Sequence, residues 1–350
     1  MLNDAFLLVL AALSAWVLTW GFRTLPQEQW QIAAAIPIAK DGSGQWHGLN
    51  LTYYGVFHAS AYVAGVALMF VLLGAVGIPL RGSVTMAVLL LCCCIPASKL
   101  VARLVERKRA TFTVGGAVFV GVLLGPWVFS WANRTLGPAL GFDLPVAAAL
   151  AAAAIGYALG EGIGRLACVS FGCCYGQPLS RVAPWLQRLL REHSFIFNGK
   201  TKKVAYEGGL EGEKVVPIQA ITAALFVTTA LLASAIFLRG HHRAALGLAF
   251  VVTQAWRSFS ETLRADYRGG GKLSAYQIMA LLAMPYLLAL LPFLPAPSAQ
   301  PADVLAGLWS LWDPWMILCM QGLWCAIFFY TGRSVVTEAT LSFHVRHDRI

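Results

Sequence analysis

Long, uninterrupted runs of apolar residues fill most of the chain, and short polar segments separate them. Each run is close to the roughly 20 residues that a helix needs to cross the hydrocarbon core of a bilayer. The runs are continuous rather than alternating, which argues against the strands of a transmembrane β-barrel. They predict about nine membrane-spanning helices at residues 5–22, 53–77, 83–103, 112–133, 145–168, 217–238, 244–261, 275–295 and 303–331. The expected fold is an all-α polytopic integral membrane protein, with residues 1–350 in a single transmembrane domain.

The polar segments indicate what lies outside the membrane. The first apolar run follows Asp4 and no lysine or arginine, so it lacks the positive start of a signal peptide, and we expect 1–22 to be a retained helix. Residues 23–50 form one substantial polar stretch. Residues 177–216 mix charged residues with glycine and predict a small extramembrane cap.

The composition agrees with this fold class. Hydrophobic residues make up 58% of the chain and charged residues only 12%, about half of the roughly 25% that is usual for a soluble protein. The net charge of +10 would suggest nucleic acid as the partner of a soluble protein. Here the basic residues lie in short loops between apolar runs, so we expect no nucleic acid and anionic phospholipid headgroups instead.

Six ionisable residues lie inside or at the ends of the predicted spans, where a charge usually faces a polar cavity or a partner. They are Lys99, Glu161, Arg165, Arg257, Glu261 and Arg264. Snorkelling at a helix end would account for any one of them but not for all six together. Helical spacing places the first acid–base pair on one face of its helix and the last three residues on one face of another. The pattern predicts a buried polar site between two helices.

The eight cysteines do not follow the spacing of a secreted disulfide framework. Five of them lie within apolar runs and are expected to fill helix surfaces: Cys92, Cys93, Cys94, Cys319 and Cys325. For Cys168, Cys173 and Cys174 three interpretations stay open: apolar filling, a disulfide on an oxidising face, and a nucleophile or metal ligand. Arg165 nearby would lower a thiol pKa and favour a nucleophile. No histidine or carboxylate repeats at ligand spacing, so we predict no metal.

Five motifs carry a family resemblance. Residues 164–176, GRLACVSFGCCYG, resemble the signature Gly-Arg-x-x-Asn-Phe-x-Asn-Gly-Glu-x-x-Gly of prolipoprotein diacylglyceryl transferases. The other four follow in the family's order: Tyr54-Gly55 at the start of a span, Thr113-Val114-Gly115-Gly116 in the place of His-Gly-Gly, Pro217-Ile218-Gln219 for Pro-Ser-Gln, and Arg257-x-x-x-Glu261-x-x-Arg264 with Gln277 opening the next span. The resemblance covers a transferase-like core at about 50–295. Spans 1–22 and 303–331 would be additions to the usual seven.

Four positions depart from the family's motifs. Val114 replaces the histidine and cannot accept a proton, Cys168 replaces the first asparagine, and Cys173 replaces the glutamate. Ile221-Thr222 stand where the family has Tyr-Glu after Pro-Ser-Gln.

Two residues offer replacements for what is lost. His58 lies one helical turn after Tyr54 on the same face and is either a substitute base or a packing histidine. Glu161 supplies the missing carboxylate or forms an ion pair with Arg165.

The resemblance implies an enzyme that moves a diacylglyceryl group from phosphatidylglycerol to the lipobox cysteine thiol in the signal peptide of lipoprotein precursors. It implies no cofactor and a multi-pass location in the bacterial cytoplasmic (inner) membrane. Arginine suits the phosphate through bidentate, permanently charged contacts. A base must deprotonate the acceptor thiol, whose ordinary pKa is about 8.5.

The resemblance also assigns roles to residues. The implied catalytic residues are Tyr54, His58, Arg165, Arg257 and Glu261. Arg165 and Arg257 would hold the phosphate, and Glu261 would orient an arginine or a glyceryl hydroxyl. Tyr54 would line the site. The implied substrate-binding residues are Lys99, Gly115, Gly116, Glu161, Cys168, Cys173, Gly176, Arg264 and Gln277.

Two alternative functions and the orientation remain open at this point. The chain could be a lipid-modifying enzyme with Cys173 or Cys174 as its nucleophile, or a non-catalytic lipid-binding or transport protein on the same scaffold. The family's orientation places the site toward the outer face, and we prefer it. The positive-inside rule favours the opposite orientation, because the family's orientation would place most lysines and arginines on the outer face.

Overall fold

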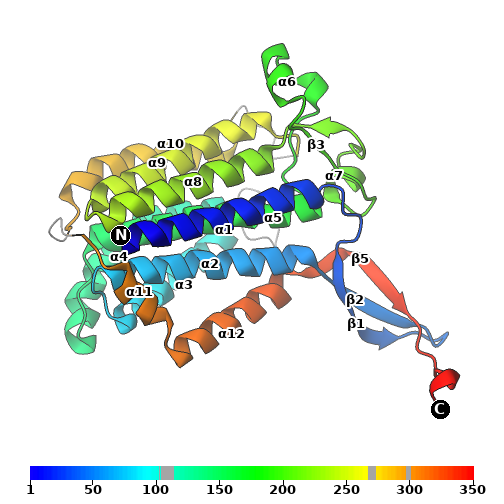
Figure 1. Cartoon of the computed structure of the whole chain (residues 1–350), viewed down its shortest axis with the longest axis horizontal. Helices are drawn as coiled ribbons and strands as arrows, with labels where there is room; N and C mark the ends of the chain where they lie inside the picture. The colour runs from blue at the N-terminus through cyan, green and yellow to red at the C-terminus, as the bar shows by residue number, and fades with distance from the viewer. Residues whose placement is uncertain (102, 104–113, 267–272, 297–300) are drawn as a thin grey trace.

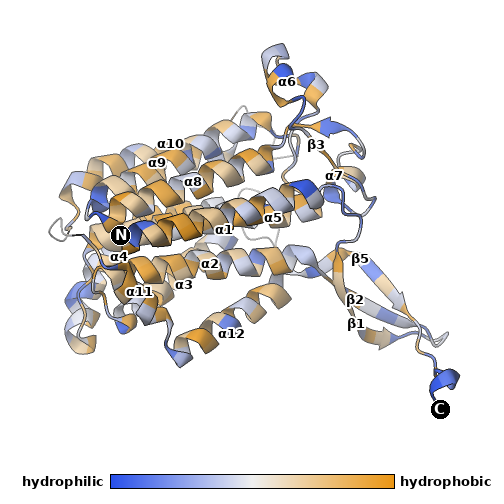
Figure 2. Ribbon diagram, in the orientation of Figure 1, coloured by the Kyte–Doolittle hydropathy of each residue, from blue (hydrophilic) through white to orange (hydrophobic). Residues whose placement is uncertain are grey.

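The computed structural model describes residues 1–101, 103, 114–266, 273–296 and 301–350. Apolar helices lie side by side in one bundle, and their surfaces are largely hydrophobic (Figures 1 and 2). Eight described helical segments are long and apolar enough to cross a membrane: α1 (Leu2–Thr24), α2 (Tyr53–Ala75), α3 (Leu80–Val101), α4 (Val114–Leu140), α5 (Val146–Phe171), α8 (Ile218–Leu238), α10 (Ala275–Leu290) with its extension to Phe293, and α12 (Pro314–Thr331). The predicted class, an all-α multi-pass membrane protein, is confirmed.

The predicted span 244–261 corresponds to α9 (His242–Ser260), which runs alongside the other helices and packs against α5, α8 and α10 (Figure 1). Polar residues on α9, among them Thr253 and Gln254, are buried. Because α9 lies inside the bundle, these polar side chains contact protein rather than lipid.

The last predicted span is wrong as a single helix. The run 303–331 divides into α11 (Val304–Leu311) and α12, which diverge from each other (Figure 1). Asp313 accepts hydrogen bonds from the backbone N–H groups of Trp315 and Met316, and Pro314 occupies the first turn of α12. A capping aspartate followed by proline starts a new helix rather than continuing the old one.

The centre of the bundle is the contact between α2 and α5. A Cβ atom on Gly65 would lie 2.6 Å from the carbonyl oxygen of Gly156, and one on Gly156 would lie 2.5 Å from that of Gly65. Small residues at such crossings let helix backbones touch inside a membrane. Because the two helices run in opposite directions, this crossing holds the first turns of α2 beside the last turns of α5 (Figure 1).

A three-stranded antiparallel sheet lies outside the bundle, and the hydrophobic pattern did not predict it. Its strands are β1 (Ile32–Lys40), β2 (Trp46–Thr52) and β5 (Arg333–Leu341), in the order β1-β2-β5. β2 leads directly into α2, and the N–H of Thr52 donates to the carbonyl of Gly332 at 2.8 Å. The sheet thus anchors the start of α2.

Residues 177–216 lie at the same end of the bundle as the sheet (Figure 1). They form short elements: η2 (Leu179–Arg181), α6 (Pro184–Leu190), β3 (Phe195–Ile196), α7 (Lys203–Tyr206) and β4 (Lys214–Val215), with β3 and β4 paired. The described residues also form the single turns η3 (Glu261–Leu263), η4 (Leu291–Phe293) and η5 (His347–Arg349).

Lys202 attaches this region to the bundle. Its side chain is 0% exposed, and its Nζ donates to the carbonyls of Leu25 at 2.8 Å and Ser170 at 2.9 Å, at the ends of α1 and α5. Burial lowers the pKa of Lys202 from 10.5 to about 8, although the charge of Glu28 acts in the opposite direction. The folded state therefore releases this proton at a lower pH than the unfolded state.

We expect the unfolding free energy in detergent to rise by about 2 kcal/mol between pH 8 and pH 10 through Lys202, because the unfolded chain binds more protons in that window. Lys202→Met should remove this part of the pH dependence, whereas Lys200→Met, at an exposed neighbouring position, should keep it. Chemical unfolding of the three proteins at both pH values provides the test. Parallel pH curves for all three would contradict the assignment.

Candidate active site

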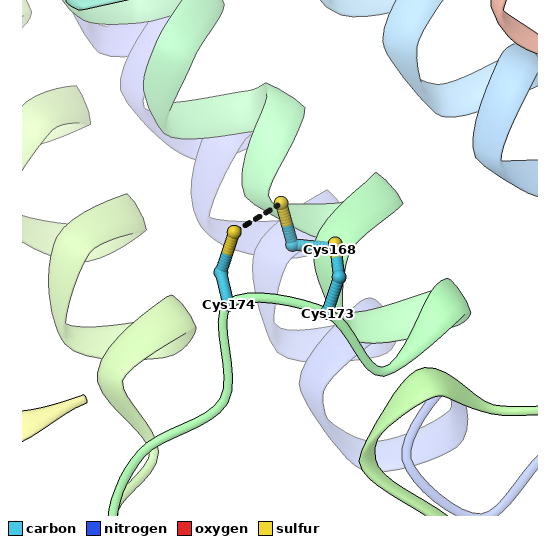
Figure 3. A group of neighbouring side chains, drawn as sticks. All are labelled: Cys168, Cys173 and Cys174. Atoms are coloured by element: carbon cyan, nitrogen blue, oxygen red, sulfur yellow. Dashed lines mark hydrogen bonds between the residues drawn. The ribbon is translucent and has the colours of Figure 1, made fainter. Parts of the chain in front are cut away.

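α5 ends in a left-handed turn at Gly172, which has a φ of 67°. The N–H of Gly172 donates to the carbonyl of Val169 at 3.2 Å, and that of Cys173 donates to the carbonyl of Cys168 at 3.0 Å. Glycine adopts this backbone conformation without the strain that a side chain would add. The turn sends the chain back over the last turn of α5, so Cys173 and Cys174 return beside Cys168 (Figure 3).

The three thiols form a compact group, the cysteine cluster of Cys168, Cys173 and Cys174. Their sulfur atoms all lie within 4.8 Å of one another, and the Sγ atoms of Cys168 and Cys174 are 3.9 Å apart (Figure 3). None of the three forms a disulfide with a described residue, and all three are partly exposed. Contacts with the other two thiols, and then burial, raise the pKa of Cys173 well above its ordinary value. The predicted lowering of a thiol pKa is therefore wrong for Cys173.

One turn before the cluster, Glu161 and Arg165 form the ion pair that their spacing indicated, with Nη2 of Arg165 donating to the carboxylate. Both side chains are mostly buried. The Nε of Arg165 is buried without a hydrogen-bond partner in the part of the chain that the structure describes. The guanidinium therefore keeps donor capacity beyond its carboxylate.

The first turns of α2 present an aromatic stripe to this pair. The ring of His58 stacks on Tyr54 at 5.3 Å between centroids and lies 4.9 Å from the ring of Tyr62. The charges of Glu161 and Arg165 both act on His58. No described residue hydrogen-bonds the ring nitrogens of His58, so its ring is held by stacking and keeps both nitrogens available.

The end of α9 corrects a sequence prediction. Arg257, Glu261 and Arg264 do not share one helix face, because α9 ends at Ser260 and Arg264 has an extended backbone (φ −91°, ψ 150°). The hydroxyls of Ser260 and Thr262 donate to the carbonyls of Arg257 and Phe259. Such bonds use carbonyls near the helix end and compete with further helical bonding.

Beyond that point the chain joins the loop that follows the cysteine cluster. Gly176 and Arg264 form an antiparallel bridge, and the N–H of Ala265 donates to the carbonyl of Tyr175 at 3.1 Å. A Cβ on Gly176 would lie 2.3 Å from the carbonyl oxygen of Val216, so this position requires glycine. The signature motif on α5 and the arginine motif after α9 are thereby placed side by side.

Arg264 is neutralised by a residue that the sequence reasoning missed. Its Nε and Nη2 each donate to a carboxylate oxygen of Asp266 at 2.8 Å, and the carboxylate of Glu261 lies 3.8 Å from Nη1. All three side chains are at most 9% exposed. The charge of Arg264 is therefore compensated within the protein. In the sequence, only the Arg-x-Asp spacing of residues 264–266 could have indicated this ion pair.

Arg257 has a different environment. Among the described residues no carboxylate, that of Glu261 included, lies within 4.0 Å of it. Its guanidinium lies 5.8 Å from the centre of the Tyr276 ring, and its Nε is buried without a hydrogen-bond partner there. A Cβ on Gly115 would lie 2.5 Å from Nη2. The glycine thus lets the backbone of α4 approach the arginine.

Tyr157 on α5 lies within electrostatic range of both Arg165 and Arg257, and the sequence reasoning missed it as well. The charges of Arg257, Arg165 and Glu161 all act on it, and its buried hydroxyl makes no hydrogen bond of good geometry to the described residues. In the sequence, Tyr157 is one aromatic residue within an apolar helix, and nothing in that pattern indicates a place in the site.

The remaining predicted residues lie near this site or around its framework. Gly116 packs against Val101, where a Cβ would meet the valine at 2.6 Å. Gln277 caps α10 and donates from Nε2 to the carbonyl of Ser258 at 2.9 Å. Lys99 is exposed on the last turn of α3. Thr113 lies outside the described residues.

Electrostatic contacts unite the parts of the site. Arg165 is influenced by Cys168, Cys174 and Arg264. The candidate site therefore combines the first turns of α2, the last turns of α5 with the cysteine cluster, and the segment after α9. It contains three guanidinium groups, of which two contact carboxylates and Arg257 contacts none in the described chain.

Comparison with known proteins is consistent with this arrangement. The family model for prolipoprotein diacylglyceryl transferase matches residues 45–293. The match extends from β2 to η4 and includes the site, while α1, β1, α11, α12 and β5 lie outside it. No curated protein matches the chain.

We expect Asp266→Asn to destabilise the protein by about 3 kcal/mol or more, because it leaves a buried guanidinium without its main carboxylate. Asp348→Asn is the matched control, since Arg346 and Asp348 have the same spacing and fork geometry but are 61% exposed. That change should cost less than about 1 kcal/mol. Unfolding in detergent compares the two variants, and equal losses would refute a structural role for the buried fork.

Proposed function

The chain belongs to the prolipoprotein diacylglyceryl transferase family, and from this premise we propose that it moves a diacylglyceryl group from phosphatidylglycerol to the lipobox cysteine thiol of lipoprotein precursors. Family membership makes it a multi-pass membrane transferase of lipoprotein biosynthesis. The donor, the acceptor and a location in the bacterial inner membrane are parts of the proposal.

The environment of Arg257 carries the proposal. A permanently charged group at this depth requires an anion or a polar partner, because an unpaired charge in an apolar setting is costly. Arg165 and Arg264 contact carboxylates, and Arg257 contacts none among the described residues. The phosphodiester of an anionic phospholipid is an anion that the bilayer itself supplies.

The two arginines would both donate to oxygens of the phosphate group. Arg257 offers a guanidinium without a carboxylate, and Arg165 offers donors beyond the one that Glu161 accepts. Guanidinium groups bind phosphate through parallel N–H donors and keep their charge at any physiological pH. The buried hydroxyl of Tyr157, on which the charges of both arginines act, would add a further donor.

The chemical step then follows from these positions. His58 takes the proton from the acceptor thiol, and the thiolate attacks the glyceryl carbon that bears the phosphate ester. A sulfur–carbon bond forms while the carbon–oxygen bond breaks, and glycerol phosphate leaves with the electron pair. The arginines stabilise the charge that develops on the departing phosphate. Tyr54 lines the site and fixes the ring of His58 by stacking.

The direct experiment incubates purified protein with phosphatidylglycerol labelled in its diacylglyceryl part and a synthetic lipobox peptide. We expect label on the peptide through a thioether and one glycerol phosphate released for each peptide modified. A peptide with serine in place of the cysteine should remain unlabelled. Binding of phosphatidylglycerol without release of glycerol phosphate would refute the transferase and favour a lipid-binding protein.

We expect Arg165→Lys and Arg257→Lys each to lower kcat by about 10-fold or more, because a lysine keeps the charge but cannot give two parallel bonds to phosphate. Arg243→Lys is the control. Arg243 donates from Nε and Nη2 to the carbonyl of Leu294, at the opposite end of the bundle, and its replacement should change kcat less than twofold. Full activity in both site variants, with normal membrane insertion, would exclude the phosphate-binding role.

A further inference from the structure

Two residues of the cysteine cluster, Cys168 and Cys173, occupy the positions where the family's signature has an asparagine and a glutamate, and the base in the histidine motif is also replaced, by Val114. Although the ligand spacing in the sequence predicted no metal, the three sulfur atoms converge, and we propose that Cys168, Cys173 and Cys174 bind a zinc ion whose fourth coordination position takes the acceptor thiol. This inference deepens the proposed function and rests on it for the identity of the acceptor.

The sulfur positions fit a zinc ion. Zinc binds thiolates at about 2.3 Å in tetrahedral geometry, which places neighbouring sulfur atoms about 3.8 Å apart. Cys168 and Cys174 are 3.9 Å apart at Sγ, and all three sulfur atoms lie within 4.8 Å of one another (Figure 3). Small side-chain rotations would therefore complete three bonds. Three protein ligands with one open position are typical of catalytic rather than structural zinc sites.

The backbone that presents the three thiols is fixed from several sides. Nε2 of Gln219 donates to the carbonyl of Cys173 at 2.9 Å, and the N–H of Val204 donates to that of Gly172 at 2.9 Å. Nζ of Lys202 holds the carbonyl of Ser170 just before the turn. A preorganised loop loses little conformational freedom when a metal binds.

Basic side chains lie near the sulfur atoms. Three thiolates and a divalent cation carry a net charge of −1. Arg165 and Arg264 act on sulfur atoms of the cluster, and Lys203 acts on Cys173. Each of these cations also pairs with a carboxylate, of Glu161, Asp266 or Glu207, so together they would offset only part of the negative charge of the complex.

Zinc also addresses the chemical problem that Val114 creates. A thiol that coordinates zinc is deprotonated outright, so the ion generates the nucleophile that the family's histidine would otherwise help to form. The replacement of the histidine by valine and the gain of two cysteines are then parts of one change in how the acceptor thiol is activated. A disulfide between Cys168 and Cys174 would leave one thiol over and offer no such activation.

The reaction balances without any further reagent. The acceptor thiol loses its proton to His58 as it binds the fourth position. Its sulfur then forms a bond to the glyceryl carbon while the carbon–oxygen bond breaks, and the electron pair departs on glycerol phosphate. The thioether product is a weaker ligand than a thiolate, so it leaves and the three cysteines retain the zinc ion.

The first test measures metal binding in the full-length protein. After purification with added Zn²⁺ and removal of loosely bound metal, we expect one zinc per chain. Cys168→Ser and Cys174→Ser should each lower the affinity at least 10-fold, as expected when a ligand is lost. Cys319→Ser, at an exposed position on α12, should leave it unchanged. Zinc-free protein, with or without a Cys168–Cys174 disulfide, would overturn the proposal.

The second test asks whether the acceptor binds the metal. With Co²⁺ in place of zinc, thiolate-to-metal charge-transfer absorption should increase when the lipobox peptide is added, and the serine peptide should cause no increase. Transfer activity that persists in metal-free protein would overturn the zinc inference and leave the proposed function intact. A protein that binds zinc and the peptide thiol but transfers no lipid would leave the zinc site intact and overturn the proposed function.

Discussion

Direct backbone contact between α2 and α5 sets the geometry on which the candidate site depends. At Gly65 and Gly156 a single added methyl group would come within 2.6 Å of a carbonyl oxygen on the other helix, so the helices could no longer approach as closely. His58 lies two turns from this crossing on α2, and Arg165 lies a few turns from it on α5. At about 1.5 Å per residue both side chains are close enough that a small separation of the helices would move them apart. The positions of the stacked rings and of the ion pair therefore depend on the glycine contact between α2 and α5, to which these side chains do not contribute.

The sequence predicted those features that depend on uninterrupted helix. The Glu161–Arg165 pair forms because both residues lie within α5, where i, i+4 spacing has a fixed meaning. The same reasoning failed after Arg257, since the helix ended at Ser260 and the spacing lost that meaning. Partners that come from elsewhere in the fold, such as Tyr157 beside Arg257, have no periodic signal. The convergence of the three thiols depended on a left-handed turn at Gly172, which a motif comparison does not describe.

The charges of the site divide into two kinds. Arg264 is bound in a fork by Asp266 and holds the segment after α9 in place, so its charge is used within the protein. Arg165 gives one of its donors to Glu161, whereas Arg257 lies beside the ring of Tyr276 and the backbone of Gly115 and pairs with no carboxylate of the described residues. The phosphate of the proposed substrate would thus contact one arginine that is paired with a carboxylate, Arg165, and one that is not, Arg257. Most of the guanidinium charge of the site is therefore compensated within the protein, while Arg257 still attracts an anion.

The segments outside the family match also support the site. A Cβ on Gly55 would lie 2.4 Å from the Cα of Gly332, so the glycine of the Tyr-Gly motif lets the end of α12 pack against the first turn of α2. The carbonyl of Gly332 accepts hydrogen bonds from both the N–H and the hydroxyl of Thr52, directly before that turn. Tyr54 stacks on His58. The backbone at Tyr54 is therefore fixed both by the C-terminal part of the chain and by β2, which pairs with β5. In this protein the C-terminal helix and strand form part of the framework that positions the catalytic groups we propose.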